Sequence, residues 1–176
     1  MKKFELTSEF VTFLGKKLFR IKALVSFGDV KEGELGGLVE KEENLDQSGN
    51  AWVSGNARIS GDARVSGDAQ VYGNARVSGD AQVSGNAWVS GDAWVSGDAW
   101  VQNCRDYSAT SCFGSENRTT TFFRTKDGGI SVRCGCFYGT LNEFREKVKE
   151  RHGDSRLAKE YLMLADLMEF RLSKDE

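Results

Sequence analysis

The chain has 176 residues, a formal net charge of −2 and no proline, which suits one domain or a small domain joined to a repeat. The near-neutral charge excludes a general nucleic-acid binder, which needs a basic face, and a strongly acidic mimic of DNA. No apolar run reaches the length of a membrane span, and the opening MKKFELTSEF is unlike a signal peptide. We therefore expect a soluble, cytoplasmic protein without nucleic-acid or membrane partners.

Residues 1–48 differ from the repeat that follows them and are typical of an N-terminal cap. Residues 16–27, KKLFRIKALVSF, alternate apolar and basic side chains, as a strand with one buried face does. The glycine-rich stretch GDVKEGELGG then leads toward the repeat. The open end of a repeat array exposes strand edges and core, so a cap is expected there.

Nine hexads without interruption occupy residues 49–102, each close to Gly-[Asn/Asp]-Ala-x-[Val/Ile]-Ser. The alanine and the aliphatic residue two positions later fall on one side of a strand, so we expect them to fill a core. The Gly-Asn and Gly-Asp pairs suit corners, because these residue types tolerate left-handed backbone conformations. A disordered linker is the alternative, but linkers have no reason to place a valine at every sixth residue.

The hexads resemble the hexapeptide-repeat left-handed parallel β-helix, in which three hexads make one triangular coil. The resemblance implies a mainly β fold with three 18-residue coils, and it also implies a homo-oligomer, with a trimer favoured. The short strand, GDVKEGELGGLVEKEENL and the hexads together resemble the opening of uncharacterised hexad-repeat proteins of bacteria and their phages. That second resemblance implies a phage or prophage origin and no established activity.

Residues 18 positions apart should stack on one face of such a prism. At the fourth hexad position this predicts the columns Trp52–Gln70–Trp88, Arg58–Arg76–Trp94 and Arg64–Gln82–Trp100. The last coil then carries one tryptophan on each face, and exposed tryptophans form an apolar patch. We expect them to pack under the C-terminal segment or to contact a partner. The predicted partner-binding residues are Trp88, Trp94, Trp100, Arg58 and Arg76.

Residues 103–176 are predicted to form a ββαα module. The stretch 119–138 indicates a hairpin with Asp127-Gly128 in its turn. Thr140 and Glu143 form a capping box that opens a helix to about residue 151. Asp154 or Ser155 then caps a longer helix through about residue 172, whose apolar stripe should cover the hairpin.

The stretch 114–126, GSENRTTTFFRTK, gathers hydroxyl, amide and cationic side chains. Backbone amides of small residues flanked by arginine can hold a phosphate group. The stretch matches no phosphate-loop signature, and a polar hairpin edge is the alternative. The predicted ligand-binding residues are Ser115, Asn117, Arg118, Thr119, Thr120, Arg124 and Lys126.

Two sets of residues raise the question of a metal ion. One is a corner column of aspartates, Asp62, Asp80 and Asp98, which suits a cation or simply solvated turns. The other is the cysteine set Cys104, Cys112, Cys134 and Cys136, whose Cys-x-Cys spacing is not that of a usual zinc knuckle. We predict no metal and no cofactor.

Catalysis is not expected from this chain. The best-known enzymes with this solenoid are acyltransferases, and that resemblance implies a histidine base on a coil or an inserted loop. The only histidine, His152, lies outside the repeat. We expect a non-enzymatic, phage-encoded binding protein of the counter-defence type, which sequesters a phosphate-bearing signalling nucleotide or blocks a host defence protein. A self-assembling structural scaffold is the alternative, and a nucleotide-acting enzyme ranks below it.

Overall fold

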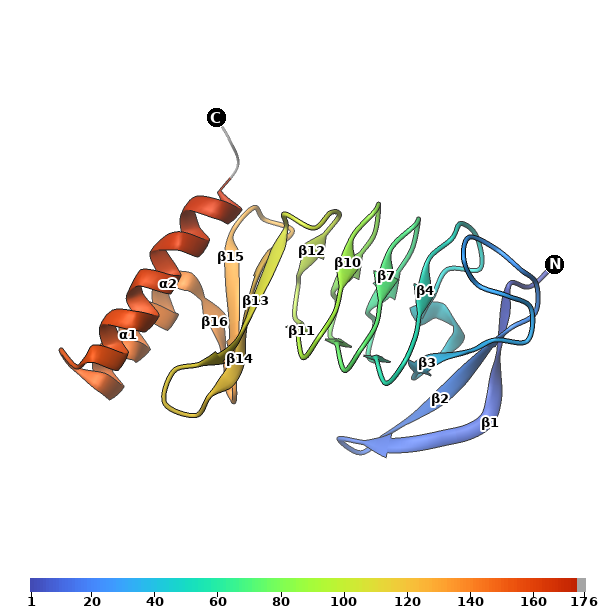
Figure 1. The fold of residues 1–176 in the computed structure, drawn as a ribbon, viewed down its shortest axis with the longest axis horizontal. Helices are drawn as coiled ribbons and strands as arrows, with labels where there is room; N and C mark the ends of the chain where they lie inside the picture. The colour runs from blue at the N-terminus through green and yellow to red at the C-terminus, as the bar shows by residue number, and fades with distance from the viewer. Residues whose placement is uncertain (174–176) are drawn as a thin grey trace.

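The computed structural model describes residues 1–173 and shows a β-solenoid with a β-hairpin at one end and an α+β module at the other (Figure 1). The hairpin comprises β1 (Phe4–Phe13) and β2 (Lys16–Ala23), and β3 (Leu35–Val39) follows. The solenoid strands are β4 (Trp52–Val53), β5 (Arg58–Ile59), β6 (Arg64–Val65), β7 (Gln70–Val71), β8 (Arg76–Val77), β9 (Gln82–Val83), β10 (Trp88–Val89), β11 (Trp94–Val95) and β12 (Trp100–Val101).

The solenoid confirms the arrangement predicted from the hexads. Its strands stack in parallel in the orders β4-β7-β10, β5-β8-β11 and β6-β9-β12, so the three predicted columns are adjacent in space. The second of these continues the sheet β1-β2-β3, whose own strands pair antiparallel. Every hexad alanine and every valine or isoleucine two residues later is fully buried. The first residue of each hexad has positive φ, and at Gly49 an added Cβ would lie 2.5 Å from the Gly67 carbonyl oxygen. Stacked corners therefore require glycine.

The solenoid has about four turns, because a partial coil precedes the three predicted from the hexads. Leu38 in β3 pairs in parallel with Arg58, and Leu45 forms a parallel bridge with Val65. These contacts supply two sides of the additional coil. On the third side, the Lys3 ammonium donates to the carbonyl oxygen of Ala51 at 2.9 Å and so covers the free edge of β4.

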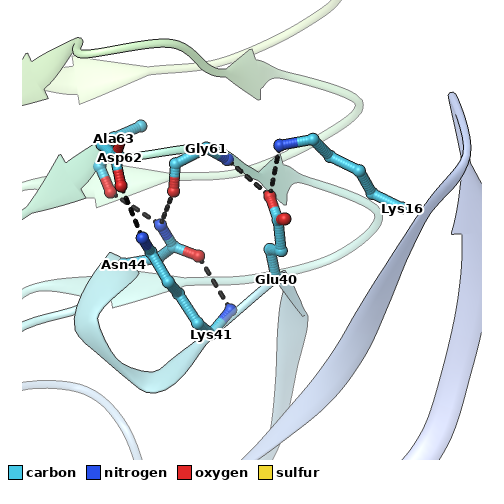
Figure 2. A network of polar contacts seen from close by, with 7 residues as sticks. All are labelled: Lys16, Glu40, Lys41, Asn44, Gly61, Asp62 and Ala63. Atoms are coloured by element: carbon cyan, nitrogen blue, oxygen red, sulfur yellow. Dashed lines mark hydrogen bonds and ion pairs between the residues drawn. The ribbon is translucent and has the colours of Figure 1, made fainter.

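Asn44 fastens the partial coil to the first complete one (Figure 2). This residue ends a 3-10 turn (Glu42–Asn44), and its side chain is fully buried. Its Nδ2 donates to the carbonyl oxygens of Gly61 and Ala63 at 3.0 and 2.8 Å, and its Oδ1 accepts from the Lys41 N–H at 2.9 Å. One amide side chain therefore satisfies backbone groups that no strand reaches.

Glu40 connects the hairpin to the same corner. Its Oε2 accepts from the Gly61 N–H at 2.6 Å and from Lys16 Nζ of β2 at 2.9 Å. Burial raises the pKa of Glu40, but these two hydrogen bonds outweigh it and hold that pKa below the ordinary value. The charged carboxylate is therefore part of the folded cap.

Lys3 makes the stability of the cap depend on pH. Burial lowers the pKa of its ammonium group from 10.5 to about 8, against the opposing charge of Asp46. The unfolded chain then binds more protons between pH 8 and 10.5, so the free energy of unfolding should rise across this window, by up to about 3 kcal/mol. Chemical denaturation at several pH values checks this, with Lys3→Met as control. Parallel pH profiles for the two proteins would contradict it.

The C-terminal module contains more strands than the sequence predicts. Its antiparallel sheet has the order β13 (Tyr107–Phe113), β14 (Arg118–Arg124), β15 (Ile130–Cys134) and β16 (Phe137–Thr140). The predicted hairpin is the central pair, and β13 and β16 extend it on both sides. The helices α1 (Leu141–His152) and α2 (Arg156–Leu172) confirm the two predicted helices, with Thr140 and Ser155 as their N-caps.

The sheet lies between the helices and the solenoid (Figure 1), and alternation along β14 decides what each face contacts. Phe122 packs with the helices and Val132, whereas Phe123 joins the core of the solenoid. Ala99 bridges to Thr125, and the Trp94 N–H donates to Thr121 Oγ1 at 3.0 Å. The module therefore covers the C-terminal end of the prism. None of the helices in residues 1–173 combines the length and apolar character needed to cross a membrane.

Candidate functional site

The predicted phosphate-binding residues do not form one cluster. Thr120 and Thr121 are buried in β14, where the Thr120 hydroxyl donates to Cys134 Sγ and the Thr121 hydroxyl accepts from the Trp94 N–H. Ser115 is exposed in the β13–β14 connection. The central threonines therefore serve packing within the sheet and its contact with the solenoid.

Arg124 and Lys126 of the predicted set have structural partners. Arg124 donates to the carbonyl oxygens of Leu172 and Ser173 at the end of α2, at 2.7 and 2.8 Å, and it pairs with buried Asp106 at 3.2 Å. Lys126 Nζ donates to the Asp80 carbonyl oxygen at 3.0 Å. Both cations therefore help to hold the module in place, and neither lines the groove described next.

The remaining predicted residues line a groove where the module meets the solenoid, which we call the arginine groove. It has a volume of about 400 Å³. The sheet contributes Asn117, Arg118, Thr119 and Arg133, and the solenoid contributes Arg76 and Trp94. The structure thus combines part of the predicted ligand set with part of the predicted partner set in a single concave site.

Arg133 lies over the ring of the tryptophan in this groove. Its guanidinium carbon is 3.8 Å from the ring centroid of Trp94, and that of Arg76 is 5.3 Å from the same ring. Each contact is a cation–π interaction. The Arg133 Nε atom is buried without a hydrogen-bond partner in residues 1–173, and burial lowers the pKa of this guanidinium. Because this Nε atom is shielded, an anion in the groove would bind the terminal Nη groups of Arg133.

The charge of the groove is positive. Within residues 1–173, neither Arg76 nor Arg133 forms an ion pair, and Arg118 pairs with exposed Glu116 at a distance of 3.6 Å. Asp92 also lines the groove, and its carboxylate accepts from Asn74 Nδ2 at 3.1 Å. Three guanidinium groups against two carboxylates, Asp92 and Glu116, favour an anionic ligand, and guanidinium geometry matches phosphate oxygens.

The other predicted partner residues lie apart from the groove. Trp88 and Trp100 project from two other faces of the prism and are 57% and 40% exposed, whereas Trp94 is half-buried under Arg133. Arg58 lies under the tip of the N-terminal hairpin, with its guanidinium carbon 4.5 Å from the Phe13 ring. The last coil does carry one tryptophan per face, but the three have different surroundings.

Sequence reasoning missed Arg133. Alternation with buried Val132 indicates that this side chain points toward the opposite face of the sheet from the helices. That pattern does not identify Trp94 as the neighbour of Arg133, because the contact depends on how the C-terminal sheet docks on the solenoid, which alternation along one strand does not specify.

The possible metal ligands are also dispersed. In the part of the chain that the structure describes, no group of three or more His, Cys, Asp or Glu side chains is placed to hold an ion. Asp62 of the predicted column pairs with Lys41 Nζ at 2.6 Å (Figure 2), and the Asp98 carboxylate accepts from the Tyr138 hydroxyl at 3.4 Å. The four cysteines are free thiols.

Comparison with protein families agrees with the fold of the central region. A family model described as the YdcK beta solenoid repeat matches residues 57–70, 69–83 and 81–97. No curated protein matches the chain. The matched residues lie within the hexads, so this likeness shows a β-solenoid repeat. It does not extend to the C-terminal sheet, which supplies Arg118 and Arg133 to the groove.

Proposed function

We propose that the protein is a non-enzymatic binding protein that captures a phosphate-bearing small molecule in the arginine groove. The observation that carries the proposal is Arg133, a guanidinium that is stacked on Trp94, partly desolvated and free of any carboxylate partner in residues 1–173. Arg76 and Arg118 stand beside it. A phosphate in the groove would supply acceptors to guanidinium N–H groups of these side chains.

The biological role that we propose is sequestration. A small protein that binds a phosphate-bearing signalling nucleotide would lower its free concentration in the host, which is a counter-defence role suited to a phage or prophage gene. End-to-end assembly into a scaffold receives less support, since the hairpin segment covers one end of the solenoid and the sheet covers the other.

The proposal is tested by titration calorimetry with inorganic pyrophosphate, comparing the intact protein with Arg133→Gln. Because the substitution keeps an amide donor but removes the charge, we expect at least about tenfold weaker binding, as for a lost charge-assisted hydrogen bond. Arg64→Gln is the control for the loss of one positive charge, since Arg64 is exposed on another face of the solenoid and does not line the groove. Equal losses for both variants, or no binding to the intact protein, would reject the groove as an anion site.

Native mass spectrometry complements the titration. Protein purified gently from its expression host should carry an additional mass that disappears on denaturation and on Arg133→Gln substitution. The same spectra report the number of subunits, for which we propose a homo-trimer.

A second candidate function rests on Trp88 and Trp100, whose exposed rings suit a protein partner, either a host defence protein or another subunit. Trp88→Ala is expected to reduce the sedimentation coefficient of the oligomer if the ring contacts another subunit. An unchanged oligomer that loses a host protein in pull-down would instead favour the heterologous partner. An unchanged oligomer and an unchanged set of bound proteins would reject this surface.

A further inference from the structure

A second cavity lies beside the arginine groove, and we call it the ring cavity. It has a volume of about 290 Å³ and lies between the β13–β14 and β15–β16 turns and the two helices. Its walls include Phe137, Phe144, Tyr161 and His152, and cations at its edge include Arg118 and Arg151. At the lower end of ligand-pocket volumes, this space suits a single aromatic ring system.

The aromatic wall is held rigidly. The rings of His152 and Tyr161 are stacked at 5.7 Å with an interplanar angle of 25°, and Phe144 contacts Tyr161 edge-on at 5.8 Å. Tyr161 also closely approaches Gly114, where an added Cβ would clash with the phenol hydroxyl. Phe144 and Tyr161 are only 3% and 6% exposed and support the half-buried rings of Phe137 and His152. Phe137 and His152 therefore offer the accessible surface for a planar ring, next to an opening edged by cations.

The ring cavity and the arginine groove share Arg118 and Gly135 as lining residues. Gly135 has positive φ and carries no side chain that would separate the two spaces. Arg118 is exposed and reaches both, so its guanidinium can hold a phosphate at the boundary. The groove lies on the solenoid side of the sheet and the cavity on the helix side, so a ligand that occupies both passes around the end of the sheet at Arg118 and Gly135.

We infer that the phosphate-bearing ligand is a nucleotide whose base enters the ring cavity while its phosphate binds in the arginine groove. This inference rests on the proposed function and goes further by assigning two subsites with separate chemistry. A base against aromatic side chains contributes binding that a sugar phosphate lacks, roughly tenfold or more in affinity. His152 belongs to this subsite as a binding residue.

The experiment compares AMP and UMP with ribose 5-phosphate, which has the phosphate and sugar but no ring. Affinities come from calorimetry, and the imidazole resonances of His152 report the cavity, since the chain contains one histidine. We expect at least one nucleotide to bind about tenfold more tightly than ribose 5-phosphate and to shift the His152 resonances. His152→Ala should remove this advantage and leave ribose 5-phosphate binding unchanged, whereas Arg133→Gln should weaken every ligand.

The outcomes separate the two proposals. If ribose 5-phosphate binds as tightly as both nucleotides, or if the His152 resonances do not move, the ring subsite is wrong and the anion site stands. If none of the three compounds binds at millimolar concentration, the ring subsite and the phosphate-binding function are both wrong. The resonances of the intact protein decide the matter even if His152→Ala does not fold.

Discussion

Replacing Asp106 by alanine is expected to lower the free energy of unfolding by about 3 to 5 kcal/mol, the cost of breaking a buried ion pair. Asp106 is 4% exposed at the point where the last coil passes into the C-terminal sheet. Its Oδ2 accepts from the N–H groups of Gln102 and Asn103 at 2.9 and 3.0 Å, and its Oδ1 lies 3.2 Å from Arg124 Nη1. The substitution leaves all these donors without their acceptor.

The effect should reach beyond the turn itself. Arg124 joins Asp106 to the carbonyl oxygens at the end of α2, so loss of the carboxylate also loosens the helix. Denaturant unfolding followed by tryptophan fluorescence measures the change. Asp154→Ala serves as control, because Asp154 is exposed and forms no hydrogen bond or ion pair through its side chain within residues 1–173, and exposed positions typically change stability by less than about 0.5 kcal/mol. A loss below about 1 kcal/mol for Asp106→Ala would contradict the structural role.

Asn44→Ala is expected to destabilise the opposite end of the solenoid by about 3 kcal/mol. The buried amide serves two carbonyl oxygens and one N–H group, and alanine leaves these backbone groups unsatisfied in a site from which water is excluded (Figure 2). The loss should appear as a lower denaturation midpoint.

Asn56→Ala is the matched control for this substitution. Asn56 lies at an exposed corner of the same coil, and its side chain makes no hydrogen bond in the described structure. Its replacement should change the free energy of unfolding by less than about 0.5 kcal/mol. Similar losses for both variants would show that the amide network is not what fastens the cap.

The solenoid was predictable because the residue pattern that specifies it is complete within each hexad. Each hexad repeats the same inward alanine and valine, and parallel pairing at a separation of 18 residues follows once three hexads close a coil. The two helices were predictable for a similar reason, since Thr140 and Ser155 signal their starts. In all these elements the pattern and the packing agree.

The caps were only partly predictable, because their positions depend on contacts between distant residues. The strand β13 has the sequence YSATSCF, in which polar residues interrupt the apolar pattern, and its pairing with β14 decides its conformation. Asn44 reads as one polar residue among several in EKEENLDQ, and nothing local indicates that it is fully buried.

The candidate site shows the same limit. Arg76 and Arg118 were each predicted to bind something, but as members of separate surfaces. The docking of the sheet on the solenoid, through the Trp94 N–H and Thr121, brings them into one groove and adds Arg133. A single sequence carries the chemistry of each side chain but not the juxtaposition that makes a site.

The 18-residue periodicity fixes both the distance and the relative rotation between the two caps of the solenoid. Inserting or deleting one coil would change the distance between the caps by about 4.8 Å, the spacing of paired strands, and leave every face aligned. Inserting a single hexad would instead turn the C-terminal module by a third of a revolution. Arg133 would then face a different sheet, so evolutionary change in the length of this solenoid preserves the groove only in steps of whole coils.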